Sequence, residues 1–149
     1  MSGDLPPSTD EPATAEQLLR LADEYHEAAK TLAGLGRRGD PLSRAPFRLA
    51  AIHAIELYLS ALLRHEGCSP SEIRRMQHDL AQRMELATGR GLALRDKTAK
   101  HIADLTDNRE YLVSRYGPQM TAKASQVNRI TATLNEVAAK VTAKMQASV

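Results

Sequence analysis

Hydrophobic residues recur with helical spacing near the beginning of the chain. From residue 15 to residue 34 they return every three or four positions, which is the pattern of an amphipathic α-helix. Thr14 and Gln17 stand three residues apart at its start, as in an N-terminal capping box. Gly34 and Gly36 follow, and glycine commonly ends a helix. The pattern therefore predicts a first helix over about 15–34.

The next hydrophobic segment, over about 43–66, is almost uniformly apolar. Within residues 49–63 the polar positions are His53, Glu56 and Ser60. A proline in the expected first turn is compatible with a helix start, and a glycine follows the expected end. A helix that is hydrophobic nearly all round must be buried on most of its sides. We therefore expect this segment to be the central helix of the fold.

Shorter signals predict the helices that follow. Ser69 and Glu72 form a second capping box, which starts a short helical turn. Asp79 is expected to cap a third helix that ends before Gly89. Two later helices are predicted, over about 93–114, with a kink or break at Asp107-Asn108, and over about 120–146.

The whole chain of 149 residues is long enough for one domain. Residues 1–13 contain three prolines and several small polar residues, which is typical of a flexible arm. Residues 14–149 are expected to form a single helical domain. Since no window alternates with the period of two that a strand requires, the predicted fold class is all-α, a compact bundle of four to five helices.

Composition excludes several classes of protein. The single cysteine, Cys68, excludes a disulfide framework and a cysteine-rich zinc site. Since the histidines are also scattered, no metal site is expected, and no cofactor is expected either. The acidic, proline-rich N-terminus does not resemble a signal peptide. The longest uninterrupted apolar run is residues 49–52, far from the ~20 residues of a membrane span. We therefore expect a cytoplasmic protein without a membrane partner.

Charge is distributed unevenly along the chain. Residues 1–35 contain seven acidic and two basic residues, a net charge of −5, whereas the remainder has +7 out of an overall +2. A basic body of this size attracts phosphate groups. The same charges also suit an ordinary solvated helical surface, and both interpretations stay open.

Four polar residues of the second predicted helix fall on one side of it. His53, Glu56, Ser60 and Arg64 lie within an arc of about 80° at 100° per residue. One interpretation is a polar cleft lined by His53 and Glu56. The other is a solvent-exposed edge, with Glu56 paired to Arg64 or to another helix, because an unpaired carboxylate on an apolar helix is costly.

Two further motifs are candidate binding elements. His78, which precedes the expected cap Asp79, is either a ligand or base, or a residue that closes the loop before the helix. Arg109, Arg115 and Tyr116 belong to the sequence DNREYLVSRYGP. Such side chains hold phosphates and stack on bases, but they also cap helices and pack in cores.

The order and spacing of three of these blocks resemble the HEPN family. The blocks are AIELYLSALL at residues 54–63, HDL at residues 78–80 and YLVSRY at residues 111–116. The resemblance covers about residues 15–145. Two positions depart from the family pattern: Ser60 stands where a lysine is usual, and Gly117 separates the Arg-Tyr pair from the following proline.

The resemblance implies a small helical bundle that forms a homodimer. Many HEPN domains are RNA-cleaving toxins or defence effectors, and others bind nucleotides or pair with a nucleotidyltransferase. Catalytic members share an Arg-x(4–6)-His motif that acts on the RNA 2′-hydroxyl without a metal. Of three stretches with this spacing, Arg95 to His101 matches best, with Arg95 as phosphate stabiliser and His101 as general base. On one continuous helix, however, six residues correspond to a rotation of about 240°, which directs the two side chains to different sides.

The resulting functional hypothesis is a non-catalytic module of a bacterial toxin–antitoxin or defence system. It would bind nucleotide, RNA, or a partner such as a nucleotidyltransferase or an antitoxin. Its expected binding residues are Glu56, His78, Arg109, Arg115 and Tyr116. The first alternative is a metal-independent endoribonuclease that uses Arg95 and His101, and the second is a structural bundle that associates with itself.

Overall fold

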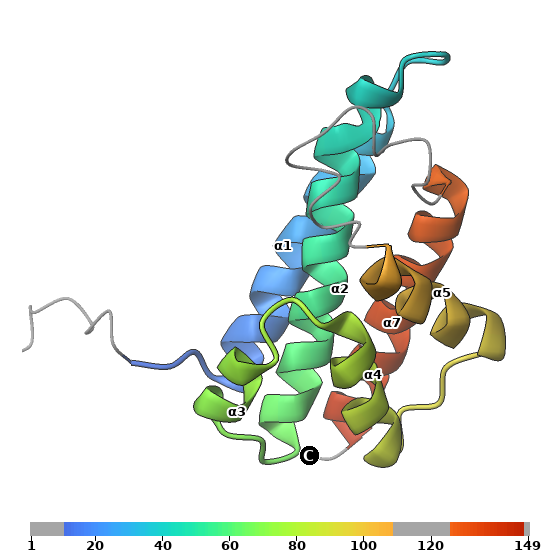
Figure 1. The fold of residues 1–149 in the computed structure, drawn as a ribbon. Helices are drawn as coiled ribbons and strands as arrows, with labels where there is room; N and C mark the ends of the chain where they lie inside the picture. Colours follow the sequence, from blue (N-terminus) through green and yellow to red (C-terminus); the bar gives the residue numbers. More distant parts are fainter. Residues whose placement is uncertain (1–10, 109–125, 148–149) are drawn as a thin grey trace, which may run out of the picture.

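The computed structural model describes residues 11–108 and 126–147, and within these ranges it is a helical bundle (Figure 1). It confirms the all-α fold class, since the described extended pairing is limited to one isolated bridge between Arg37 and Asp40. The elements are α1 (Ala15–Ala33), the 3₁₀ turn η2 (Pro41–Arg44), α2 (Ala45–His65), α3 (Pro70–Arg75), α4 (Leu80–Gly89), α5 (Asp96–Asp107) and α7 (Val127–Ala147).

The three predicted N-terminal caps are present. The hydroxyl of Thr14 accepts from the amide of Gln17, and the Gln17 side chain accepts from the Thr14 amide in return. Ser69 and Glu72 make the same reciprocal pair at the start of α3. The carboxylate of Asp79 accepts from the amide of Gln82 and caps α4. Local sequence therefore determines where these helices begin.

The bounds of the later helices differ from their predictions. The helix expected from residue 93 begins at Asp96, because residues 92–95 are not helical: Leu92 is buried in the core and the N-cap Arg95 has an extended backbone. It ends at Asp107, where a break was expected, and the predicted residues 109–114 lie outside the described part. The last helix is described from Val127, so residues 120–125 of its predicted range also lie outside.

Helix α2 is the centre of the bundle, as its hydrophobic surface predicted. It packs against α1, α4 and α7, while α5 packs against α4 and α7 (Figure 1). Its side chains Ile55, Leu59 and Leu62 are completely buried. Each such residue contributes about 1.5–3 kcal/mol of transfer free energy, so α2 organises the other helices around itself.

A polar chain also joins α1 to α2 and α7. The hydroxyl of Tyr58 donates to the carboxylate of Asp23 at 2.5 Å, and burial together with this carboxylate raises the pKa of Tyr58. The ring of His26 lies between the Tyr58 hydroxyl, at 3.2 Å, and Oδ1 of Asn135, at 2.9 Å. Tyr58 is therefore a buried structural group with a satisfied hydroxyl.

By length and composition, the segment Pro41–His65 is apolar enough to cross a membrane, with a mean hydropathy of 1.3. Polar residues divide it, so it contains no long uninterrupted apolar run. In the fold, 72% of this apolar window is buried against the other helices. The central helix of a bundle has the same composition, so this similarity is weak evidence for a membrane span.

Candidate functional site

The fold brings together two of the predicted binding residues, Glu56 and His78. Nδ1 of His78 lies 2.9 Å from a carboxylate oxygen of Glu56, although the residues are 22 positions apart. Nδ1 of His53 lies 4.0 Å from the other oxygen. His78 is held there by the connection between α3 and α4, in which Gln77 has a positive φ of 49°. The Glu56 carboxylate thus lies between two imidazoles.

A buried arginine, Arg83, interacts electrostatically with Glu56. The Arg83 side chain donates from Nε to the Ser60 hydroxyl at 3.0 Å and from its terminal nitrogens to the carbonyls of Asp79 and Ile73. Burial lowers the pKa of Arg83, and the negative charges of Glu56 and Asp79 oppose this effect. Glu56 therefore compensates a buried cation as well as pairing with His78.

The predicted polar side of α2 divides into separate roles. Ser60 is buried, and its hydroxyl accepts a hydrogen bond from Arg83. Arg64 instead donates to the backbone carbonyls of Ala13 and Cys68. The Glu56 side chain is only 15% exposed and pairs with His78. Glu56 pairs neither with Arg64 nor with another helix, but with His78 in the loop before α4, and Arg64 is used elsewhere. The interpretation of this side as a solvent-exposed edge is wrong at Ser60 and Glu56, because both are largely buried.

A surface hollow of about 470 Å³ lies beside His78. Its walls also include Arg75, Asp79, Gln82 and Thr106. The Asp79 carboxylate and the Thr106 hydroxyl already accept from amides at the start of α4. Much of the polar surface of this hollow therefore serves the helix start, which agrees with the structural interpretation of the His-Asp pair.

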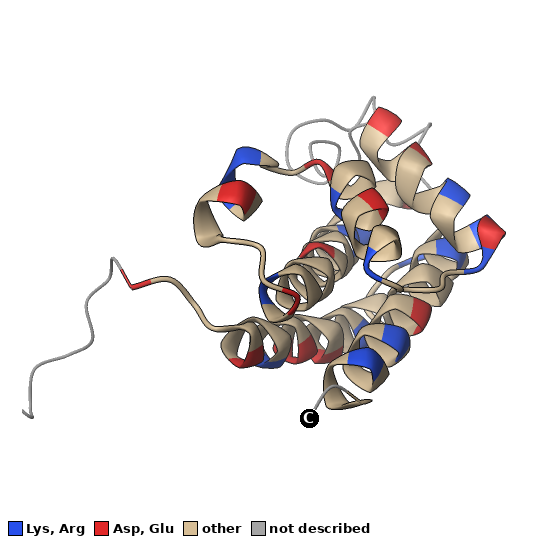
Figure 2. Cartoon of the chain, turned by 90° about the horizontal axis from the view of Figure 1, so that it is seen from below, with Lys and Arg blue, Asp and Glu red and all other residues tan. Residues whose placement is uncertain are grey.

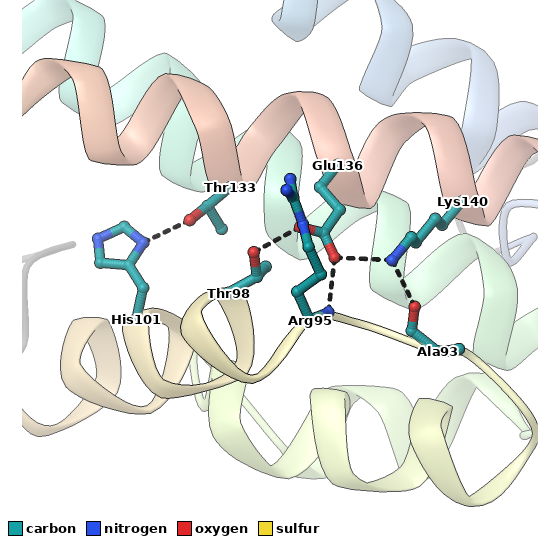
Figure 3. A network of polar contacts seen from close by, with 7 residues as sticks. All are labelled: Ala93, Arg95, Thr98, His101, Thr133, Glu136 and Lys140. Carbon is teal, nitrogen blue, oxygen red and sulfur yellow. Dashed lines mark hydrogen bonds and ion pairs between the residues drawn. The ribbon is translucent and has the colours of Figure 1, made fainter.

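Arg95, the first residue of the predicted catalytic pair, is bound to Glu136 of α7 (Figure 3). Its amide donates to one carboxylate oxygen at 2.8 Å and its Nε donates to the other at 2.9 Å. Thr98 and Lys140 donate to the same carboxylate at 2.6 and 2.9 Å. Burial acts to raise the pKa of Glu136, but these hydrogen bonds outweigh it and lower the pKa to about 2.

His101, the second residue of the pair, is buried against α7. Its Nδ1 lies 2.6 Å from the hydroxyl of Thr133. Burial lowers the pKa of His101 to about 4, and the positive charge of Arg129 adds to this effect against the opposing Asp104. The imidazole is therefore neutral near pH 7, and it is a weaker base than an ordinary histidine.

The helix starts between Arg95 and His101, because Arg95 is the N-cap and α5 begins at Asp96. The rotation of about 240° expected for one continuous helix therefore does not apply. Figure 3 shows both side chains directed toward α7, where they meet Glu136 and Thr133, one helical turn apart. Within this chain, Thr98 lies between them, and each is engaged by its own partner.

A basic pocket lies between α5 and the start of α7, and His101 is part of its wall. It has a volume of about 380 Å³ and is lined by Lys97, Lys100, His101, Asp104, Gln126 and Arg129. Lys100 pairs with Asp104 at 3.0 Å, so the pocket keeps a net positive charge from its other two cations. Nε of Arg129 is buried and meets no hydrogen-bond acceptor among the described residues.

Sequence reasoning did not identify this pocket. Lys97 and Lys100 are spaced to share a face of α5, but such pairs are common on solvated helices. Arg129 joins them from α7, which no local motif indicates. Glu136 had a clearer signal, since it is an acidic residue between Leu134 and Val137 on the apolar face of its helix. A carboxylate in that position needs buried partners.

The charge asymmetry of the sequence has a counterpart in space. Figure 2 shows acidic positions along α1, whereas α7 has mainly basic ones.

The remaining expected binding residues, Arg109, Arg115 and Tyr116, lie outside the described residues. Within residues 11–108 and 126–147, no cluster of three or more histidine, cysteine or acidic side chains is arranged to hold a metal ion.

The chain matches no protein-family model, and searches among curated proteins and among solved structures found no significant match.

Proposed function

We propose that this chain is a HEPN-like helical bundle that binds a phosphate-bearing ligand, a nucleotide or RNA, without cleaving it. The observation that carries the proposal is the basic pocket between α5 and α7, whose lining includes Lys97, Lys100 and Arg129. Lysine and arginine are the usual partners of phosphate oxygens. Nε of Arg129 is buried and meets no acceptor among residues 11–108 and 126–147, and an anion can supply one.

The state of the two motif residues favours binding over cleavage. The side chain of Arg95 is hydrogen-bonded through Nε to Glu136, which positions it against α7. The low pKa of His101 makes its imidazole a poor acceptor for the proton of a ribose hydroxyl. Both residues thus have structural partners that account for their positions.

Binding is tested by fluorescence anisotropy with a labelled short single-stranded RNA and with a labelled nucleotide. The variant Lys97→Glu/Lys100→Glu should bind at least one of these ligands with an affinity that is lower by roughly tenfold or more. Arg20→Glu/Arg74→Glu is the matched control, because it makes the same change in net charge at exposed positions on α1 and α3. Equal losses in both variants would reduce the effect to overall charge and contradict the proposed pocket.

The endoribonuclease alternative is favoured by the start of α5 between Arg95 and His101, which directs both side chains toward α7. The same RNA is incubated with the wild type, Arg95→Ala and His101→Ala in the presence of EDTA and examined on a gel. We expect intact RNA in every lane. Cleavage by the wild type that both substitutions abolish would establish the alternative and refute a non-catalytic module.

A further inference from the structure

A second basic hollow lies next to the pocket between α5 and α7. It has a volume of about 370 Å³ and is lined by Arg44, Arg48, Gln126, Val127 and Asn128. Gln126 is part of both hollows, so they meet at the residue that precedes α7. Figure 1 shows that α2 and α7 begin at the same end of the bundle, which brings the arginines of η2 and α2 to this place.

Arg44, the last residue of η2, packs closely against Gly36. A Cβ atom added to Gly36 would lie 2.6 Å from Nη1 of Arg44 and 2.9 Å from its Cγ. The Arg44 side chain therefore lies directly against the Gly36 backbone, in space that any other residue at position 36 would occupy. This packing reduces the rotamer freedom that a long side chain loses when it binds a ligand.

The two hollows place cations on both sides of the start of a long helix. Arg44 and Arg48 lie on one side, and Lys97, Lys100 and Arg129 lie on the other. The N-terminal end of α7, a helix of 21 residues, adds partial positive charge between them. Each hollow has its own set of cations, so a ligand that places a phosphate group in both carries at least two phosphates.

We propose that Arg44 and Arg48 form a second phosphate subsite, so that the ligand carries at least two phosphate groups and passes over the start of α7. The proposal rests on the proposed function, whose pocket is the first subsite. The shared chemistry is a series of phosphates. A nucleoside polyphosphate and a single RNA strand both supply it, whereas a nucleoside monophosphate does not.

The test measures the binding of inorganic phosphate, tripolyphosphate, adenosine triphosphate and a short single-stranded RNA by titration calorimetry. The variant Arg44→Gln/Arg48→Gln should bind at least one ligand with several phosphates roughly tenfold more weakly. Its affinity for inorganic phosphate should remain at the wild-type value. Arg20→Gln/Arg74→Gln, which removes the same charge elsewhere, should behave as the wild type.

A second variant tests the position of Arg44 without removing its charge. Gly36→Ala displaces the Arg44 side chain, so its affinity for the ligands with several phosphates should also decrease. Its helical circular dichroism spectrum should be that of the wild type. For a single RNA strand, the salt dependence of affinity should also become shallower in Arg44→Gln/Arg48→Gln, by about 0.7 in slope for each phosphate that the variant no longer binds.

The outcomes separate the two proposals. If tripolyphosphate and RNA bind Arg44→Gln/Arg48→Gln as tightly as the wild type but lose affinity in Lys97→Glu/Lys100→Glu, the second subsite is refuted and the proposed function stands. If the wild type binds none of the four probes, both fail. If Arg44→Gln/Arg48→Gln loses more affinity for the RNA than for tripolyphosphate and adenosine triphosphate, the ligand is a nucleic-acid strand. If it loses more affinity for the two triphosphates, the ligand is a polyphosphate.

Discussion

Arg95 and Glu136 are joined by two hydrogen bonds, one from the backbone amide of Arg95 at 2.8 Å and one from its Nε at 2.9 Å. The pair fixes the first turn of α5 against the middle of α7, 41 residues further along the chain. The Glu136 side chain is 4% exposed, and Thr98 and Lys140 supply further donors to its carboxylate. A residue expected to act on RNA is thus part of the framework that positions α5.

We expect Glu136→Gln to destabilise the fold by about 3 kcal/mol. The amide of glutamine keeps the shape of the side chain, but it places a donor against the donors of Arg95 and Lys140. Urea unfolding measures the change. Glu27→Gln is the control, because Glu27 is in an exposed pair with Lys30 that should contribute less than about 1 kcal/mol.

The same carboxylate should make stability depend on acidity. The pKa of Glu136 falls from 4.5 to about 2 on folding, so its contribution is complete above pH 4.5 and disappears as the pH decreases toward 2. The difference in stability between the wild type and Glu136→Gln should therefore shrink over this window. A difference that stays constant down to pH 2 would contradict the buried hydrogen-bonded carboxylate.

His101 should produce a separate effect at higher pH. Its pKa decreases from 6.5 to about 4 on folding, so between these values the unfolded chain binds a proton that the folded chain does not. Stability should decrease as the pH is lowered from 6.5 to 4, by a few kcal/mol at most. His101→Gln, whose amide still reaches Thr133, should lose this dependence, and an NMR titration of the imidazole gives the pKa directly.

Two glycines at helix ends should respond to alanine in opposite directions. Gly67, after α2, has a φ of +100° and open space around it, so Gly67→Ala should cost about 1–2 kcal/mol through backbone strain alone. Gly89, the last residue of α4, also has open space but no positive φ. Gly89→Ala should stabilise the fold by about 0.5 kcal/mol, since alanine has less conformational entropy to lose. Thermal unfolding of both variants tests the pair.

The hydrogen bond between Ser60 and Arg83 should be important for stability. Ser60→Ala removes the acceptor of a guanidinium in a residue that is only 3% exposed, so we expect a loss of about 1–3 kcal/mol. Ser71→Ala on the exposed surface of α3 should change stability by less than about 0.5 kcal/mol. Equal unfolding midpoints for the two variants in urea would show that Arg83 does not depend on this hydroxyl.

Local sequence was enough to predict where α1, α3 and α4 begin and the central place of α2, but not the start of α5. Capping residues such as Thr14, Ser69 and Asp79 act within three positions of themselves, so their effect can be read from the neighbouring residues. The apolar surface of α2 required burial on most sides, whichever helices supplied it. The break at Asp107-Asn108 was likewise a local signal, and α5 ends there.

The packing of the helices determines which polar residues meet. Glu56 reaches His78 and not Arg64, because the connection before α4 brings an imidazole to the carboxylate while Arg64 finds backbone carbonyls. The start of α5 depends on Glu136, a residue 41 positions away from Arg95. The basic pocket combines lysines of α5 with Arg129 of α7. These relationships join residues of different helices, and spacing along a single helix does not contain that information.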